Sequence, residues 1–377
     1  MLRMTDATGR MISAVYRLAS DEYAGRRVGT PGGRAAAKWL AEQLRGAAIA
    51  FEEFPVDGTV KELYRTPSLH WTDGKTSWDL AHRRDFCEHL ASADLPFART
   101  GKWLLDKTFS AERAEQAAAA GVLGLLVPRG TDDAGWMPKM IAGPSAVELP
   151  VLALRNDIHE QMSATTATVT ASVPMRTVDV VGVNVHAVFA SPRPDGVSVL
   201  LTAHYDGVGD DPGVRFPAAA DNASGVAVML EAARQLANED LGIGLAVAFL
   251  DAEEVGAHGS AYHAPKVRAG TYVINVDGAA ALHEAAAVEA GGPAQPLLAA
   301  LDLAGRETGV PLRARAMPSD NRRYAAAGLP AIGIGMGIPG YQTPAETPDR
   351  VDPQTLARAL ALVVSTVRHL SASRSDR

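Results

Sequence analysis

The second half of the chain contains the stretch Val197-Ser198-Val199-Leu200-Leu201-Thr202-Ala203-His204-Tyr205-Asp206. Its apolar part has the length and composition of a strand that is buried on both faces in a parallel sheet. Residues 245–250 and 272–276 are apolar runs of the same kind. Each run is followed by acidic residues or a histidine, which indicates a parallel sheet whose strand ends carry a functional site.

Four segments place candidate ligands where strands are predicted to end: Ala203-His204-Tyr205-Asp206, Ala220-Asp221-Asn222-Ala223-Ser224-Gly225, Asp251-Ala252-Glu253-Glu254 and Asn275-Val276-Asp277-Gly278. The carboxyl ends of parallel strands lie at one edge of a sheet, where oxygen and imidazole ligands can converge on a metal ion. Taken alone, His204 and Asp206 fit a solvated loop, and Asp221 fits a helix N-cap. Together the four segments predict a metal-dependent hydrolase.

The adjacent carboxylates Glu253 and Glu254 are the most informative pair. Two like charges this close repel each other unless a cation or a proton lies between them. One of them can bind a metal while the other takes a proton from a metal-bound water.

From residue 178 onward the sequence alternates between strand and helix patterns, which predicts an α/β fold with a mostly parallel central sheet flanked by helices. Strands are expected at residues 180–189, 197–202, 245–250, 272–276 and 331–335, and helices at 224–237, 295–308, 321–327 and 353–370. Residues 61–175 have a different character, with short strand patterns at 102–105, 121–127 and 150–154. We interpret them as a smaller β-rich domain inserted into a catalytic domain of residues 1–60 and 176–377. Residues 128–150, rich in Gly and Pro, predict a mobile loop.

Composition narrows the functional class. The chain has 377 residues, a formal net charge of −7 and no block rich in Lys or Arg, which argues against nucleic acid as a partner. Cys87 is the only cysteine, so neither an intrachain disulfide nor a thiolate metal site can form. The first residues do not form a signal peptide, and no apolar run approaches the roughly 20 residues that span a membrane. Cytoplasmic residence without a membrane partner is expected; oligomeric state stays open.

Five motifs in order resemble the M28 family of zinc aminopeptidases: Gly25-Arg26-Arg27-Val28-Gly29-Thr30-Pro31-Gly32, Thr202-Ala203-His204-Tyr205-Asp206-Gly207-Val208-Gly209, Ala220-Asp221-Asn222-Ala223-Ser224-Gly225, Glu253-Glu254-Val255-Gly256-Ala257-His258-Gly259-Ser260 and Asn275-Val276-Asp277. The resemblance covers most of residues 178–364. It implies a peptidase fold, and the insertion is similar to a degenerate protease-associated domain.

The resemblance also implies roles for single residues. Asp221 would bridge two zinc ions, His204 and Glu254 would complete one site, and Asp277 would contribute to the other. Glu253 would be the general base, Asp206 would orient the ring of His204, and Tyr341 would stabilise the oxyanion.

Two segments depart from the family pattern. The family closes the second metal site with a histidine, in a motif similar to Tyr-His-Thr-Pro-x-Asp-Thr, where this chain has Gln342. An amide oxygen is a weaker zinc ligand than imidazole, so the second metal is in doubt; His258, His263 or His283 could replace the ligand or could be ordinary surface and packing residues. The other departure is Pro318-Ser319-Asp320-Asn321-Arg322-Arg323-Tyr324, whose arginines would change the charge of the substrate wall or lie solvated on a helix.

The leading hypothesis is therefore a metal-dependent hydrolase of peptide bonds, most simply an aminopeptidase acting on a peptide or a small amide. One alternative is a single-metal enzyme that acts on another amide-type substrate. The other alternative is a catalytically silent binding protein on the same fold.

Overall fold

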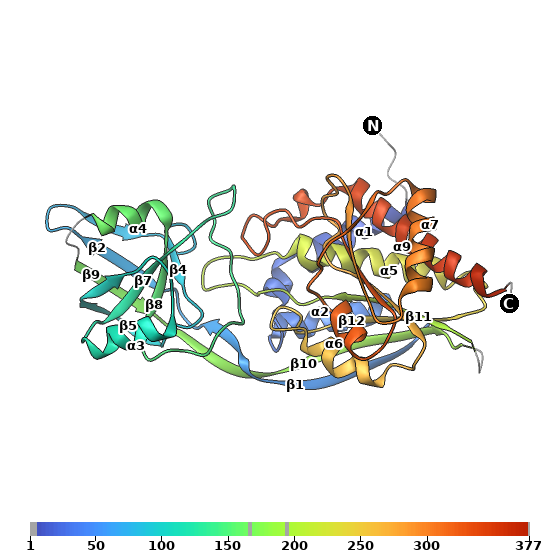
Figure 1. Cartoon of the computed structure of the whole chain (residues 1–377), viewed down its shortest axis with the longest axis horizontal. Coiled ribbons are helices and arrows are strands. Elements are labelled where there is room, and N and C mark those ends of the chain that lie inside the picture. Colours follow the sequence, from blue (N-terminus) through green and yellow to red (C-terminus); the bar gives the residue numbers. More distant parts are fainter. Residues whose placement is uncertain (1–5, 165–167, 193–195, 376–377) are drawn as a thin grey trace.

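The computed structural model describes residues 6–164, 168–192 and 196–375. The chain forms a larger lobe around a central sheet and a smaller lobe of strands, joined by a pair of long strands (Figure 1).

The larger lobe is built on an eight-stranded sheet. In spatial order its strands are β1 (Ala48–Leu63), β10 (Met175–Ala190), β12 (Gly244–Leu250), β11 (Ser198–His204), β13 (Thr271–Val276), β16 (Ala331–Gly335), β14 (Ala286–Gly291) and β15 (Leu312–Ala314). The four central strands, β12, β11, β13 and β16, run parallel. At the sides, β1 pairs antiparallel with β10, β10 with β12 and β14 with β16, while β15 pairs parallel with β14. This arrangement confirms the predicted α/β fold and adds antiparallel strands at both sides of the parallel centre.

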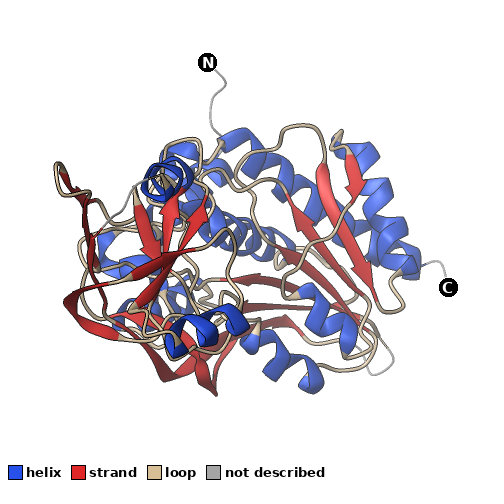
Figure 2. Cartoon of the chain, turned by 60° about the vertical axis from the view of Figure 1, so that its left-hand side comes forward, coloured by secondary structure: helices blue, strands red, loops and turns tan. Residues whose placement is uncertain are grey.

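Helices cover both faces of the central strands (Figure 2). The helices of this lobe are α1 (Asp6–Leu18), α2 (Pro31–Gln43), α5 (Ser224–Leu236), α6 (His258–His263), α7 (Gln295–Thr308), α8 (Asn321–Ala326) and α9 (Pro353–Ser375). Alternate residues of a strand point to opposite faces. Val199 and Leu201 of β11 accordingly pack in the core that includes α1, α2, α5, α7 and α9. Leu200 packs instead with Tyr324 of α8 and with Ala264, which follows α6.

The smaller lobe contains two four-stranded sheets within the segment predicted as an insertion. Their strands are β2 (Ser68–Thr72), β3 (Ser77–Leu80), β4 (Phe86–Glu88), β5 (Leu95–Gly101), β6 (Trp103–Leu105), β7 (Gly124–Arg129), β8 (Val151–Arg155) and β9 (Thr168–Val173), with helices α3 (Ala111–Ala119) and α4 (Asn156–Ser163). Trp71 of one sheet and Leu152 of the other share a hydrophobic core that is separate from the core of the central sheet. Because β1 and β10 pair from Ala48 to Leu63 and from Met175 to Val188, both connections to this lobe run along one ribbon.

Cys87 is fully buried in the smaller lobe, in agreement with a packing role. Within the described ranges, no helix is long and apolar enough to cross a membrane.

Candidate active site

His204 and Asp206 are both inaccessible to solvent at the carboxyl end of β11. The Nδ1 atom of His204 lies 3.4 Å from Oδ1 of Asp206 and 3.3 Å from its main-chain oxygen. The same carboxylate accepts hydrogen bonds from the backbone N–H groups of Glu253 (3.1 Å) and Glu254 (3.2 Å). Asp206 therefore links the imidazole ring of His204 to the acidic turn after β12.

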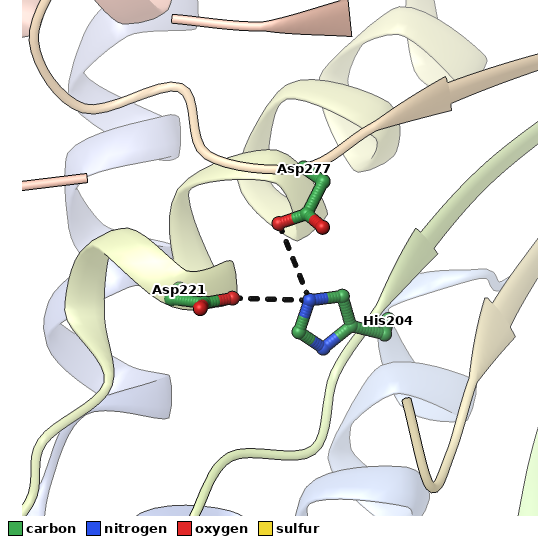
Figure 3. Close-up of side chains that lie close together, drawn as sticks. All are labelled: His204, Asp221 and Asp277. Atoms are coloured by element: carbon green, nitrogen blue, oxygen red, sulfur yellow. Dashed lines mark hydrogen bonds and ion pairs between the residues drawn. The ribbon is translucent and has the colours of Figure 1, made fainter. Parts of the chain in front are cut away.

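The other ring nitrogen of His204 points at two carboxylates (Figure 3). Nε2 lies 3.1 Å from Oδ1 of Asp221 and 3.4 Å from Oδ1 of Asp277. One ligand atom from each of the three residues lies within 4.8 Å of the others. One imidazole and two carboxylates are a donor set that zinc accepts, with a fourth position left for water or substrate. The three residues fit a divalent metal ion.

This grouping corrects the pairing expected from the sequence, which placed His204 with Glu254 and Asp277 with Gln342. Strands β12 and β13 both lie beside β11, so strand order alone does not decide which acid reaches the histidine. Asp277 directly follows β13, whereas Glu254 lies four residues beyond the end of β12. Glu254, beyond this longer turn, accepts a hydrogen bond from Gln342 and is not in the group formed with His204.

Gln342 is buried and donates a hydrogen bond from Nε2 to Oε2 of Glu254 at 2.6 Å. Its own oxygen, Oε1, has no hydrogen-bond partner among the described residues. An amide N–H group cannot bind a cation, and here it occupies the carboxylate that a second metal would need. The observed arrangement of Gln342 and Glu254 does not fit a second metal ion.

The three histidines considered as replacement ligands lie elsewhere. His263 contacts the hydroxyl of Tyr324 at 2.8 Å through Nδ1, and His283 is not buried. In the part of the chain that is described, the group of potential metal ligands contains neither of these two nor His258.

Negative charge accumulates around this site. Burial raises the pKa of Glu253 well above its ordinary value, and His204 opposes this while Asp277 adds to it. Burial, with the charges of Asp221 and Glu253, likewise raises the pKa of Glu254. The pKa of Asp277 is lowered although burial opposes this, because His204 lies beside it. A divalent cation bound here would offset the negative charge of these carboxylates, which otherwise is reduced only by protonation.

Tyr341 is partly exposed at the rim. Burial of its hydroxyl and the negative charges of Asp221 and Glu254 raise its pKa, so the phenol stays protonated and can donate a hydrogen bond. On helix α8, Arg322 is paired with Glu289 at 3.1 Å, whereas Arg323 donates to the main-chain oxygen of Gly256. Arg323 therefore lies beside the acidic turn, where it can add positive charge to the wall of the substrate site. The charge of Arg322 is neutralised by Glu289.

Arg26 is a structural residue of the site whose role the sequence alone did not reveal. Its buried guanidinium donates from Nε to the carbonyl of Tyr205 (2.8 Å) and from Nη2 to that of Ala218 (2.7 Å). These carbonyls lie in the loops that carry Asp206 and Asp221. A Cβ atom on the preceding Gly25 would lie 2.7 Å from Cα of Gly209, so only glycine permits this close approach. The motif that contains Arg26 thus holds together the loops that carry the site.

Comparison with known proteins identifies a peptidase family and related structures. Residues 184–367 match the model of peptidase family M28. A probable lipoprotein aminopeptidase of Mycobacterium tuberculosis, LpqL, is 27% identical over 278 residues, which are 68% of this chain and 54% of that protein. The match therefore spans about half the length of this relative.

Solved structures share the fold over nearly the whole chain. The zinc aminopeptidase BSAP of Bacillus subtilis superposes with a TM-score of 0.73 at 18% identity, covering 97% of this chain and 95% of its own. An M28 peptidase precursor of Shewanella amazonensis gives a TM-score of 0.72 at 17% identity, with coverage of 97% and 94%. At these identities the likeness establishes the fold.

Proposed function

Because this chain belongs to peptidase family M28, we propose that it is a metal-dependent hydrolase of peptide bonds, an aminopeptidase that releases N-terminal residues. The observation that carries the proposal is the group of buried His204 and Asp221 with half-buried Asp277, on the same sheet edge as Glu253. A binding protein without activity has no chemical need for a carboxylate with a raised pKa beside a metal site.

The metal that suits this donor set is zinc, held by His204, Asp221 and Asp277. What zinc supplies in such a site is a lower pKa for a bound water and polarisation of the scissile carbonyl. Asp206 keeps the Nε2 atom of His204 directed at the ligand position. The metal site thus depends on the hydrogen bonds of Asp206 to the turn at Glu253.

Proton transfer falls to Glu253, which follows β12 on the same sheet edge and whose pKa is raised by burial above its ordinary value. Its carboxylate takes a proton from the attacking water and delivers it to the nitrogen of the leaving amine. Tyr341 donates a hydrogen bond from its hydroxyl to the carbonyl oxygen of the substrate as negative charge develops there.

We propose that the chain uses one zinc ion, since Glu254 is engaged by Gln342 rather than free to bind a second. Replacing Gln342 by histidine is expected to raise the zinc content from about one to about two ions per chain, because imidazole binds zinc better than an amide does. Elemental analysis of both proteins, purified in parallel with excess zinc removed, measures this. A stoichiometry unchanged by Gln342→His contradicts the assignment of this residue to the second site.

Turnover of aminoacyl chromogenic amides by the zinc-loaded protein tests the function itself. One zinc per chain with release of the N-terminal residue supports an aminopeptidase. One zinc per chain without turnover of any peptide or aminoacyl amide favours a single-metal enzyme that acts on another amide-type substrate. The single group of metal ligands found among the described residues also supports this alternative. The domain division at residues 61 and 175 and the cytoplasmic location stay predictions, which limited proteolysis and cell fractionation test.

A further inference from the structure

A loop of the smaller lobe, residues 130–150 between β7 and β8, contacts the segment that carries Gln342. In Figure 1 it runs between the two lobes. The backbone N–H of Lys139 donates to the main-chain oxygen of Gln342 at 2.8 Å. The hydroxyl of Thr343 donates to Oδ2 of Asp132 at 2.8 Å. The Gly- and Pro-rich composition predicted a mobile loop, yet two of its residues are bonded to the rim of the site.

The loop is anchored by buried charges as well. The ammonium group of Lys139 lies 2.8 Å from Oδ1 of Asp211 and donates to the main-chain oxygen of Gly209 at 2.8 Å. Arg83 of the smaller lobe binds the other oxygen of Asp211 at 2.6 Å and also pairs with Glu88. Two cations and two anions balance within this buried cluster, so Lys139 holds the loop between the smaller lobe and the turn that follows Asp206.

Gln342 needs such support because its backbone has a φ of +53°, a left-handed conformation that residues other than glycine rarely adopt. Its N–H donates to Oε2 of Glu346 at 2.8 Å. The other oxygen of Glu346 accepts the backbone N–H of Asp221 at 2.6 Å. A continuous set of hydrogen bonds therefore leads from the loop through Gln342 and Glu346 to a residue of the metal group.

We propose that Asp132 and Lys139 are positioning residues for the active site: through them the smaller lobe holds residues 341–346, and with them Tyr341, in the conformation that binds substrate. The proposal rests on the proposed peptidase function for its kinetic consequence. The physical attachment of the loop does not depend on that function.

Asp132→Ala removes one of two acceptors near the Thr343 hydroxyl, which also lies 2.7 Å from the main-chain oxygen of Gly340. The substitution leaves every catalytic and metal-binding residue in place. The loss of one such hydrogen bond corresponds to about a fivefold change in an equilibrium. We expect KM for an aminoacyl amide to rise about fivefold, with the zinc content unchanged. Trypsin cleavage after Lys139, whose side chain is buried, should accelerate by a similar factor. Asp133→Ala, at an exposed neighbouring acid, is the matched control and should leave both quantities unchanged.

Two further variants separate positioning from general damage. Asp132→Asn keeps an oxygen for the N–H groups of Ala134 and Trp136 and a group that can bond to Thr343, so it should restore most of the wild-type KM. The double variant Asp132→Ala/Thr343→Val should differ from Thr343→Val alone by less than about twofold in KM and in the rate of trypsin cleavage. The reason is that both substitutions remove the same hydrogen bond between Thr343 and Asp132.

The proposal is overturned if Asp132→Ala has the KM and the trypsin cleavage rate of the wild type. It is also overturned if the effects of Asp132→Ala and Thr343→Val on these two quantities add in full. If Asp132→Ala fails to fold by circular dichroism, Thr343→Val decides instead: wild-type values of KM and of the trypsin cleavage rate in this variant overturn the proposal. If the wild type hydrolyses no amide, the proposed function fails, while the cleavage rate after Lys139 still decides whether Asp132 holds the loop.

Discussion

Replacing Glu253 by glutamine is expected to lower kcat by about 10³-fold while the zinc content stays at one ion per chain, since general acid–base catalysis contributes about 10²–10⁴-fold. The amide retains the size of the side chain but cannot accept the proton of the attacking water. Because Glu253 is outside the group formed by His204, Asp221 and Asp277, the metal should remain bound. Steady-state kinetics together with elemental analysis measure both quantities.

Glu284→Gln is the matched control, because this exposed glutamate pairs with Arg313 at the surface and lies in a loop before β14. Its kcat should equal that of the wild type. A Glu253→Gln protein that retains kcat within a factor of about two would remove Glu253 from the reaction. A loss of zinc along with activity would instead make it part of the metal site.

The central strands could be predicted because they are buried on both faces. The strand predicted at residues 331–335 is the observed β16, and the strand predicted at 272–276 differs from β13 by one residue at its start. The helix predicted at 295–308 is α7. Continuous Val, Ile and Leu runs identify such strands without knowledge of their neighbours. The alternation of strands and helices then predicts the fold.

The strands of the smaller lobe were partly missed for the opposite reason. β3 and β5 are mostly exposed or half-buried and carry no apolar run. In the central sheet, β14 consists largely of alanine and glycine, which are depleted in strands, and it is defined by pairing with β16. Such strands are specified by the strands beside them, which a single sequence does not show.

The site residues could be found from the sequence, but not their grouping. His204, Asp221 and Asp277 were each identified by their place after a strand or before a helix. Whether Asp277 or Glu254 reaches His204 depends on the path of the turn after β12, where the backbone of Glu253 and Glu254 is bound to Asp206. Side-chain direction in a turn depends on tertiary contacts, so spacing alone did not assign the partners.

The largest effect on stability is expected for Arg26→Leu, which should lower the free energy of unfolding by about 3–5 kcal/mol, as breaking a buried charged contact does. Besides the carbonyls of Tyr205 and Ala218, the guanidinium binds those of Leu18 (2.7 Å) and Pro217 (3.0 Å). Leucine would leave these carbonyl oxygens without their donors. Denaturation by urea, followed by circular dichroism, measures the change.

Charge adds to this loss of hydrogen bonds. Burial lowers the pKa of Arg26 to about 10, with Glu346, Asp206 and Asp221 opposing the shift, so the side chain is a cation at neutral pH. Without it, the repulsion among these acids is relieved only by protons or by the metal, and zinc should become more important for stability. Arg34→Leu, an exposed arginine on α2, is the control and should change stability by no more than about 0.5 kcal/mol. Equal stability of the two variants would mean that Arg26 does not hold the loops of the site together.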